Sequence, residues 1–134
     1  MNYIIDCSFS SALFLPDEKS SEIRDYFLTL KKNDQIFVPL LWWYETSSVL
    51  NISVKRERLK HGDIKIIIDL LSKLKIETDV LYGADFAKEI FNLAQMYHVS
   101  SYDAAYLELA IRKKARLKSL DEDLITAAGK IGIN

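Results

Sequence analysis

The stretch YIID at residues 3–6 places three apolar residues directly before an acid. An unbroken apolar run of this length is typical of a strand that is buried on both faces, as in a parallel sheet. Asp6 then stands at the carboxyl end of that strand. Open parallel sheets bind their ligands at this edge, so Asp6 is the first candidate site residue.

Short strands and longer helices alternate along the rest of the chain. Apolar runs predict strands at residues 3–5, 36–38, 117–120 and 131–133. Apolar periodicity and helix-start signals predict helices at residues 8–15, from 17–18 onward, from Pro39 past Leu50, and at 64–74, 83–97, 101–113 and from Asp121. This order predicts a three-layer α/β/α sandwich around a mostly parallel central sheet.

Composition limits the class of protein. A chain of 134 residues with 49% hydrophobic content can bury one core, so we expect a single domain over residues 1–134. The net charge of -1 neither demands nor excludes a nucleic-acid partner. The single cysteine, Cys7, and the absence of an opening basic and apolar leader favour a cytoplasmic protein with no membrane partner.

Two acids are expected where strands end. Asp6 and Asp121 each follow a predicted strand and precede a predicted helix. An isolated Asp in such a turn is more commonly a helix N-cap than a ligand. Both interpretations stay open when each residue is considered alone.

Two further acids lie on apolar helix faces. Glu45 shares a stripe with Leu41, Ser48 and Ile52, and this stripe is expected to face the core. A buried carboxylate needs a partner, a raised pKa or a polar cavity, and a core hydroxyl or arginine is an alternative to a cation.

Asp103 repeats this arrangement on another helix, where it shares a face with Tyr106, Leu107 and Ala110. The helix N-terminus favours an acid by only about 0.3–1 kcal/mol, and Ser101 is available as the cap. The helix dipole alone therefore does not explain an acid on this face.

Four carboxylates that converge on one point cannot all stay ionised without a counter-charge. The chain has two histidines and one cysteine in no ligand spacing, so the expected cation is Mg²⁺ or Mn²⁺ rather than zinc. Magnesium commonly meets its substrates through phosphate, which points to phosphodiester chemistry. Such a metal polarises the phosphodiester and activates water for in-line attack.

Four fragments in this order resemble PIN-domain proteins, specifically VapC toxins of prokaryotic toxin–antitoxin pairs. The fragments are YIIDCSFSSALF at 3–14, VPLLWWYETSSVL at 38–50, SSYDAAYLELAIRKKARLKSLDEDL at 100–124 and AAGKIGI at 127–133. The resemblance implies a PIN-like fold, Mg²⁺- or Mn²⁺-dependent endoribonuclease activity on RNA, frequent homodimers and inhibition by a VapB-type antitoxin.

The resemblance also assigns roles to residues. Asp6, Glu45 and Asp103 correspond to the three principal catalytic metal-site acids, and Asp121 to a more variable fourth. Ser8 and Ser119 correspond to supporting hydroxyls, although the family often has Thr at the second position. Asp123 is a rival for the fourth acid, but it is expected in the first turn of the last helix, where acids are common.

Basic residues offer possible contacts to RNA phosphates. The candidates are Arg112, Lys113, Lys114 and Arg116, and a second run lies at residues 55–60. Basic residues are also favoured and solvated at helix ends, so a structural role is the alternative.

Other functions fit the sequence less well. No glycine-rich phosphate loop is present, and Ser8 stands where a phosphatase with a DxD motif needs its second Asp. The alternatives that stay open are a PIN-like module that binds RNA or protein without cutting it, and a structure-specific DNA nuclease.

Overall fold

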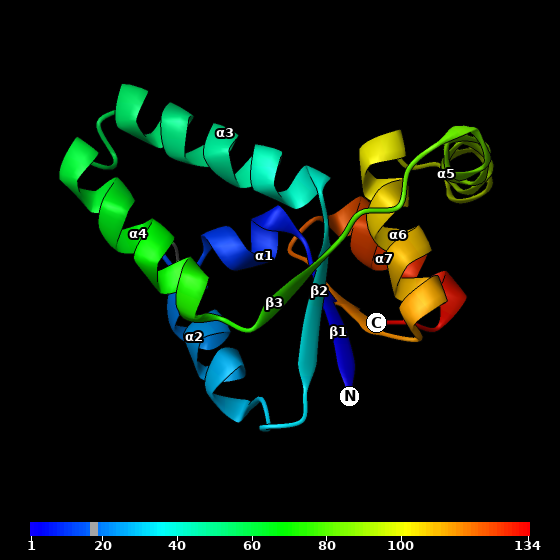
Figure 1. Ribbon diagram of the computed structural model, residues 1–134, viewed down its shortest axis with the longest axis horizontal. Helices are drawn as coiled ribbons and strands as arrows, with labels where there is room; N and C mark the ends of the chain where they lie inside the picture. Colours follow the sequence, from blue (N-terminus) through cyan, green and yellow to red (C-terminus); the bar gives the residue numbers. More distant parts are fainter. Residues whose placement is uncertain (17–18) are drawn as a thin grey trace.

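The computed structural model describes residues 1–16 and 19–134. The helix start predicted at Asp17 and Glu18 lies outside the described residues. Figure 1 shows a central sheet with helices on both sides and the chain entering the sheet directly at its first strand.

Four parallel strands form the sheet in the described part of the chain, in the order β3-β2-β1-β4. They are β1 (Asn2–Ile5), β2 (Gln35–Pro39), β3 (Ile76–Asp79) and β4 (Arg116–Lys118). The central strand β1 places Ile4 opposite Phe37 of β2 on one side and opposite Leu117 of β4 on the other. Because every pairing is parallel, the carboxyl ends of all four strands share one edge.

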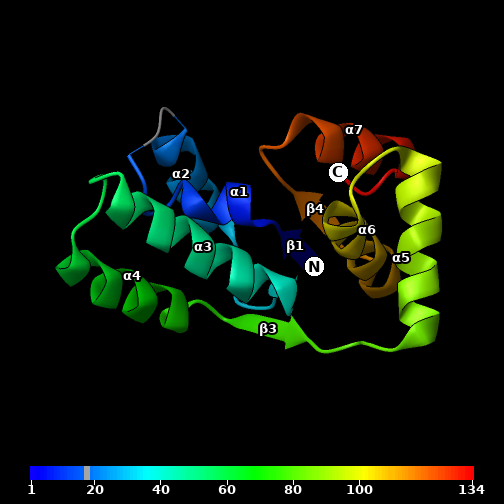
Figure 2. The same ribbon diagram turned by 90° about the horizontal axis from the view of Figure 1, so that it is seen from above.

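Helices cover both faces of this sheet, which confirms the predicted three-layer sandwich (Figures 1 and 2). One layer holds α1 (Cys7–Ser11), α2 (Ser20–Thr29), α3 (Leu41–Lys55) and α4 (His61–Lys73). The other holds α5 (Ala84–Tyr97), α6 (Ser101–Lys113) and α7 (Glu122–Ile131). Among the described residues, no helix has the length and apolar content required to span a membrane.

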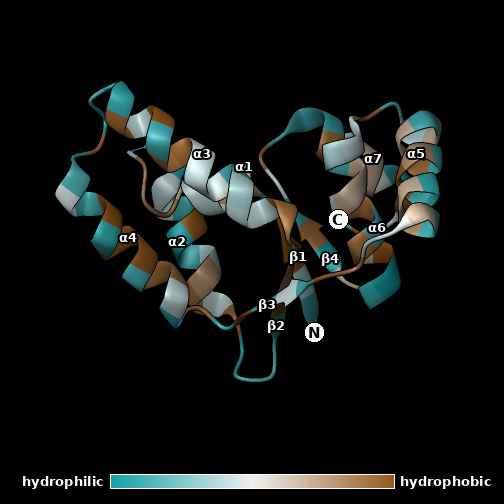
Figure 3. Cartoon of the chain, turned by 45° about the horizontal axis from the view of Figure 1, so that its top comes forward, coloured by the Kyte–Doolittle hydropathy of each residue, from teal (hydrophilic) through white to brown (hydrophobic). Residues whose placement is uncertain are grey.

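The core is built where the two helix layers meet the sheet. Ile4, Val38 and Leu107 are fully buried, and Figure 3 shows the hydrophobic residues of β1 between the helix layers. Trp42, at the start of α3, is also fully buried and donates its indole N–H to Ser10 Oγ at 3.1 Å. This bond satisfies the polar atom of the tryptophan and fixes α3 against α1.

Two sequence-based assignments of strands are corrected by the structure. Residues 131–133 form no strand: Ile131 ends α7, and Gly132 follows in the left-handed conformation with φ of 82°. Instead, the Ile133 carbonyl accepts one bond from the Leu117 N–H of β4. The missing fourth strand is β3, whose mixed sequence IETD lacks an apolar run because it is a half-exposed edge strand.

A smaller correction concerns Pro39, which was expected early in a helix. It is the last residue of β2, and α3 begins two residues later at Leu41. Proline is tolerated at this strand end because its neighbour β3 also stops there, at Asp79.

An ion-pair cluster ties the edge strand β3 to α6. The Arg112 guanidinium donates to both carboxylate oxygens of Asp79, at 3.0 and 2.6 Å, and to both oxygens of Glu108, at 2.6 and 3.1 Å. The hydrogen bonds from Arg112 are the main reason why the pKa of Asp79 is lowered. We refer to Arg112, Asp79 and Glu108 as the arginine clamp.

We expect Arg112→Met to lower the free energy of unfolding by about 2 kcal/mol, because it leaves two carboxylates without their charged donor. The matched control is Lys65→Met, which breaks the exposed helical pair between Lys65 and Asp69. That variant should lose less than about 0.5 kcal/mol. Urea denaturation measures both, and equal losses would contradict the role given to the clamp.

Candidate metal-binding active site

The carboxylate of Asp6 is buried at the carboxyl end of β1, with 5% of the residue exposed. It is the N-cap of α1, since Oδ1 accepts the Phe9 N–H at 2.9 Å. Ser8 Oγ lies 2.7 and 2.8 Å from its two oxygens, and Ser119 Oγ donates to Oδ2 at 2.5 Å. Asp6 is thus a helix N-cap, which was the alternative to a ligand. In addition, it accepts hydrogen bonds from two serine hydroxyls.

The two supporting hydroxyls join β1 to β4 at the site. Ser8 Oγ accepts the Leu120 N–H at 3.0 Å, and Ser119 Oγ accepts the Asp121 N–H at 2.9 Å. The two hydroxyl oxygens lie 3.3 Å apart. Each serine thus contacts Asp6 and also a backbone group that follows β4, which fixes the chain leading into Asp121.

Glu45 lies on α3 at the margin of the buried face rather than at its centre. The buried residues of this helix are Trp42, Thr46, Leu50 and Ser53. The predicted stripe was therefore displaced by about one residue: Ser48 is exposed, and Ile52 is 44% exposed. Glu45 is half-buried and accepts a hydrogen bond at Oε1 from the Tyr106 hydroxyl of α6.

Asp103 lies in the first turn of α6, half-buried on the face that carries Tyr106, Leu107 and Ala110, as predicted. The cap of this helix is Ser100, whose hydroxyl accepts the Asp103 N–H at 3.1 Å, and not Ser101 as expected. The N-cap is the residue before the first helical one, and the helix begins at Ser101.

Asp121 is exposed and caps α7, since its Oδ1 accepts the Leu124 N–H at 2.9 Å. Asp123 is also exposed, in the first turn of the same helix. Asp121 is the neighbour whose charge raises the pKa of both Asp6 and Asp103. The charge of Asp121 thus acts on two of the other candidate acids, and its role as the fourth acid stays a prediction.

Electrostatics show that the four acids share one region. The pKa of Asp103 is raised to about 6, first by burial and then by the charges of Asp121, Asp6 and Glu45. Burial also raises the pKa of Asp6 and of Glu45. The charge of Asp121 adds to the shift of Asp6, and the charge of Asp6 adds to the shift of Glu45. We call Asp6, Glu45, Asp103 and Asp121 the acidic cluster.

The carboxylates of the cluster act on one another electrostatically but do not stand at the distances of metal ligands. In residues 1–16 and 19–134, no three acidic, histidine or cysteine side chains stand close enough together to hold a metal. The donor set itself, oxygen atoms without nitrogen or sulfur, fits a hard divalent cation such as Mg²⁺.

The basic residues predicted to contact RNA lie at the far end of α6 and the start of β4. Asp103 and Lys113 are ten residues apart on this helix, a separation of about 15 Å. Arg112 is held in the arginine clamp, and Lys113 lies over the Phe37 ring at 4.7 Å. Lys114 and Arg116 are exposed. RNA contact by these four residues stays a prediction.

Tyr106 is the residue that the sequence interpretation named only as part of the core. It is 1% exposed, and burial together with Glu45 holds its pKa far above the ordinary value, so the hydroxyl remains a donor. Its position three residues after Asp103, on the same helical face, was the signal that could have placed it in the site.

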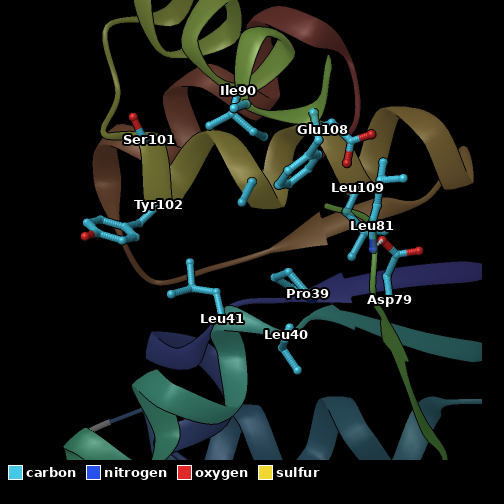
Figure 4. A pocket seen from close by; sticks show the side chains of 13 residues that line it. Pro39, Leu40, Leu41, Asp79, Leu81, Ile90, Ser101, Tyr102, Glu108 and Leu109 are labelled. Atoms are coloured by element: carbon cyan, nitrogen blue, oxygen red, sulfur yellow. Dashed lines mark hydrogen bonds between the residues drawn. The ribbon is translucent and has the colours of Figure 1, made fainter. Parts of the chain in front are cut away.

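An apolar groove of about 440 Å³ lies between α3, α5, α6 and the segment that follows β3 (Figure 4). Its lining is largely apolar, with Leu41, Leu81, Ile90 and Leu109 among the residues that Figure 4 labels. Asp79 and Glu108 of the arginine clamp also line it, whereas no member of the acidic cluster does. The groove is thus a feature separate from the acids.

We expect Asp103→Asn to stabilise the metal-free protein by about 1–2 kcal/mol at pH 7.5. The folded protein holds the Asp103 proton with a pKa of about 6, compared with an ordinary value of 3.8, so ionisation above pH 6 destabilises the folded state. A fully buried group would contribute about 3 kcal/mol, and partial exposure reduces this.

Thermal unfolding in chelator measures this effect, which should shrink as the pH falls from 7 toward 4. The control is Asp123→Asn, an exposed first-turn acid on α7, which should be neutral or slightly destabilising. Destabilisation of Asp103→Asn at pH 7.5 would contradict the electrostatic description of the cluster.

Comparison with known proteins connects this geometry to a family. Residues 3–130 match the PIN domain family. The chain is 27% identical over 124 residues to Ribonuclease VapC3 of Pyrobaculum aerophilum, a match that covers 92% of each chain.

Two solved structures share the fold. PAE2754 from Pyrobaculum aerophilum superimposes with a TM-score of 0.70 at 20% identity, over 95% of this chain and 79% of that one. VapC20 of Mycobacterium tuberculosis, a sarcin–ricin loop cleaving toxin, gives a TM-score of 0.72 at 16% identity, over 93% and 94%. The resemblance seen in the sequence is confirmed, and the chain belongs to the PIN domain family.

Proposed function

We propose that this protein is a Mg²⁺- or Mn²⁺-dependent endoribonuclease that hydrolyses RNA phosphodiester bonds, acting in the cytoplasm as the toxin of a VapBC-type pair. One observation carries the proposal: the pKa of Asp103 is raised by burial and by the charges of three other acids, Asp121, Asp6 and Glu45. Membership of the PIN domain family and similarity to Ribonuclease VapC3 support RNA as the substrate.

The acidic cluster would hold the metal through Asp6, Glu45 and Asp103, with Asp121 as the fourth acid. Acids whose negative charges raise one another's pKa destabilise the folded protein. Such groups are typical of functional sites. A divalent cation bound there would neutralise phosphate charge and activate the attacking water.

The chain's own groups would orient the reaction. Ser8, Ser119 and the Phe9 N–H hold the carboxylate of Asp6 in one orientation at the end of β1. Asp121 lies on the exposed side of the cluster, where an RNA phosphate could approach. The buried side is closed by Asp6 and by the tyrosine that contacts Glu45.

Cleavage of RNA by the purified chain tests the proposal. We expect cleavage with Mg²⁺ or Mn²⁺, none in chelator, and losses of more than about 100-fold in Asp6→Asn and Asp103→Asn, since even outer-shell partners of metals typically cost 10- to 100-fold. Asp121→Asn should also lose activity, whereas Asp123→Asn, its neighbour on α7, should keep it.

Three results would contradict this function. Cleavage that persists in chelator or in both acid variants would exclude the metal-nuclease proposal. Binding of RNA without cleavage would favour a binding module, and cleavage of DNA alone would favour a DNA nuclease.

We also propose that a VapB-type antitoxin occupies the apolar groove. The groove is lined by Leu41, one turn before Glu45, and by Ser101 and Tyr102, directly before Asp103. A peptide lying in it would therefore sit beside the acidic cluster. The side chains of Leu81 and Tyr102 are 48% and 67% exposed, which is typical of a surface that a partner covers.

The homodimer expected for VapC toxins is part of the same proposal. Helix α4 exposes Ile66, Ile68 and Leu70, which are 68%, 44% and 44% exposed. Helix α4 lies beside α3 in one helix layer, and α5 and α6 lie in the opposite layer (Figure 2). A second copy on α4 and an antitoxin in the groove would thus use different surfaces.

We expect Leu81→Asp to weaken binding of the antitoxin encoded beside this chain by about 10-fold or more, because a charge would enter an apolar contact. Cleavage of RNA by the free protein should stay unchanged. The control is Leu28→Asp, a 79% exposed leucine on α2 away from the groove. Calorimetry measures both affinities, and equal affinities would place the antitoxin elsewhere.

A further inference from the structure

Tyr106 joins the two halves of the acidic cluster. It lies on α6, three residues after Asp103, and its hydroxyl donates to Glu45 Oε1 on α3, a partner 61 residues away in the sequence. Helices α3 and α6 belong to opposite helix layers of the sandwich (Figure 2). The bond therefore crosses from the helix that carries one acid to the helix that carries another.

The acids differ in what holds them. Asp6 accepts bonds from Ser8, Phe9 and Ser119, so its orientation does not depend on one group. For Glu45, the bond from Tyr106 is the single side-chain hydrogen bond found among the described residues. Glu45 is half-buried, and its side chain has several rotatable bonds. The bond from Tyr106 therefore orients its carboxylate.

Burial of the Tyr106 ring does not by itself require that its hydroxyl contacts Glu45. The protein also buries the Tyr26 hydroxyl, which has no hydrogen-bond partner among the described residues. Tyr26 instead packs edge to face against Phe9, with ring centroids 5.3 Å apart. Among the described residues, burial of a tyrosine hydroxyl is thus not always accompanied by a carboxylate acceptor, and the contact between Tyr106 and Glu45 is a separate feature.

We propose that Tyr106 is a positioning residue for the metal site: its hydroxyl fixes Oε1 of Glu45 and thereby presents the remaining oxygen, Oε2, to the cation. This inference rests on the proposed function, since it assigns a role within the same site. Outer-shell donors of this kind orient the metal ligands and typically contribute 10- to 100-fold to metal affinity or activity.

The test compares Tyr106→Phe with Tyr26→Phe, which remove the same hydroxyl from two buried sites. Mn²⁺ affinity is measured by calorimetry and RNA cleavage by kcat and KM. Tyr106→Phe should weaken Mn²⁺ binding about 10-fold and lower kcat, with KM for RNA unchanged and Mn²⁺ at high concentration restoring much of the rate. Tyr26→Phe should match the wild type in all of these.

A double-mutant cycle identifies the partner. In a Glu45→Gln background, Tyr106→Phe should reduce Mn²⁺ affinity by less than about 2-fold, because both changes disable one interaction. An undiminished 10-fold loss there would show that Tyr106 acts through another group and would overturn the inference. So would wild-type affinity and rate in Tyr106→Phe.

A measurement on the wild-type chain needs no substitution at Tyr106. With tyrosine labelled at Cζ, Mg²⁺ should shift the resonance of Tyr106 and leave that of Tyr26 in place. A Tyr106 resonance that stays fixed at saturating Mg²⁺ would overturn the inference while the proposed function stands. A wild-type chain that neither binds Mn²⁺ nor cleaves RNA would overturn both.

Discussion

The hydrogen bonds to the buried carboxylate of Asp6 determine how the rest of the site is built. A carboxylate on a residue that is 5% exposed, at the end of the central strand, would be costly without donors. Its donors come from the turn into α1 and from the segment that follows β4. Satisfying this one group therefore fixes the start of α1, the end of β4 and the approach to Asp121. The same bonds that stabilise the fold also place the first acid.

Two groups of carboxylates in this protein differ in the charges that act on them. In the arginine clamp, Arg112 donates to Asp79 and Glu108, and the pKa of Asp79 is lowered. In the acidic cluster, burial and the charges of the other acids instead raise the pKa of Asp103 to about 6. The chain thus pairs Asp79, at the end of β3, with a guanidinium, whereas Asp6, at the end of β1, receives its hydrogen bonds from hydroxyls and a backbone N–H. An external cation is the counter-charge that we propose for the acidic cluster.

The sequence predicted the parts of the fold whose residues are buried on a regular pattern. The run YIID identified β1 and Asp6, and helical periodicity identified α5 and α6. Strand β3 was missed because an edge strand is half exposed and its sequence, IETD, mixes polar with apolar residues. The strand expected at residues 131–133 failed because Gly132 turns the chain after α7, so an apolar tail packs without pairing along β4.

The sequence also predicted where on the helices two of the candidate acids lie. Acids on apolar faces signalled Glu45 and Asp103, although the buried face of α3 is centred on Trp42 and Thr46 rather than on Glu45. Contacts between distant helices could not be predicted, because periodicity describes one helix at a time. The bond from Tyr106 to Glu45 and the clamp made by Arg112 are of this kind.

The most direct test of a single cation site shared by these acids is a crystal structure with Mn²⁺, with the metal located by its anomalous scattering. Our account predicts a peak at the carboxyl edge of the sheet, about 2.1 Å from carboxylate oxygens of Asp6 and Asp103, with Glu45 in its coordination or outer shell. A peak at Asp79 and Glu108 instead, or no ordered metal at saturating Mn²⁺, would contradict it.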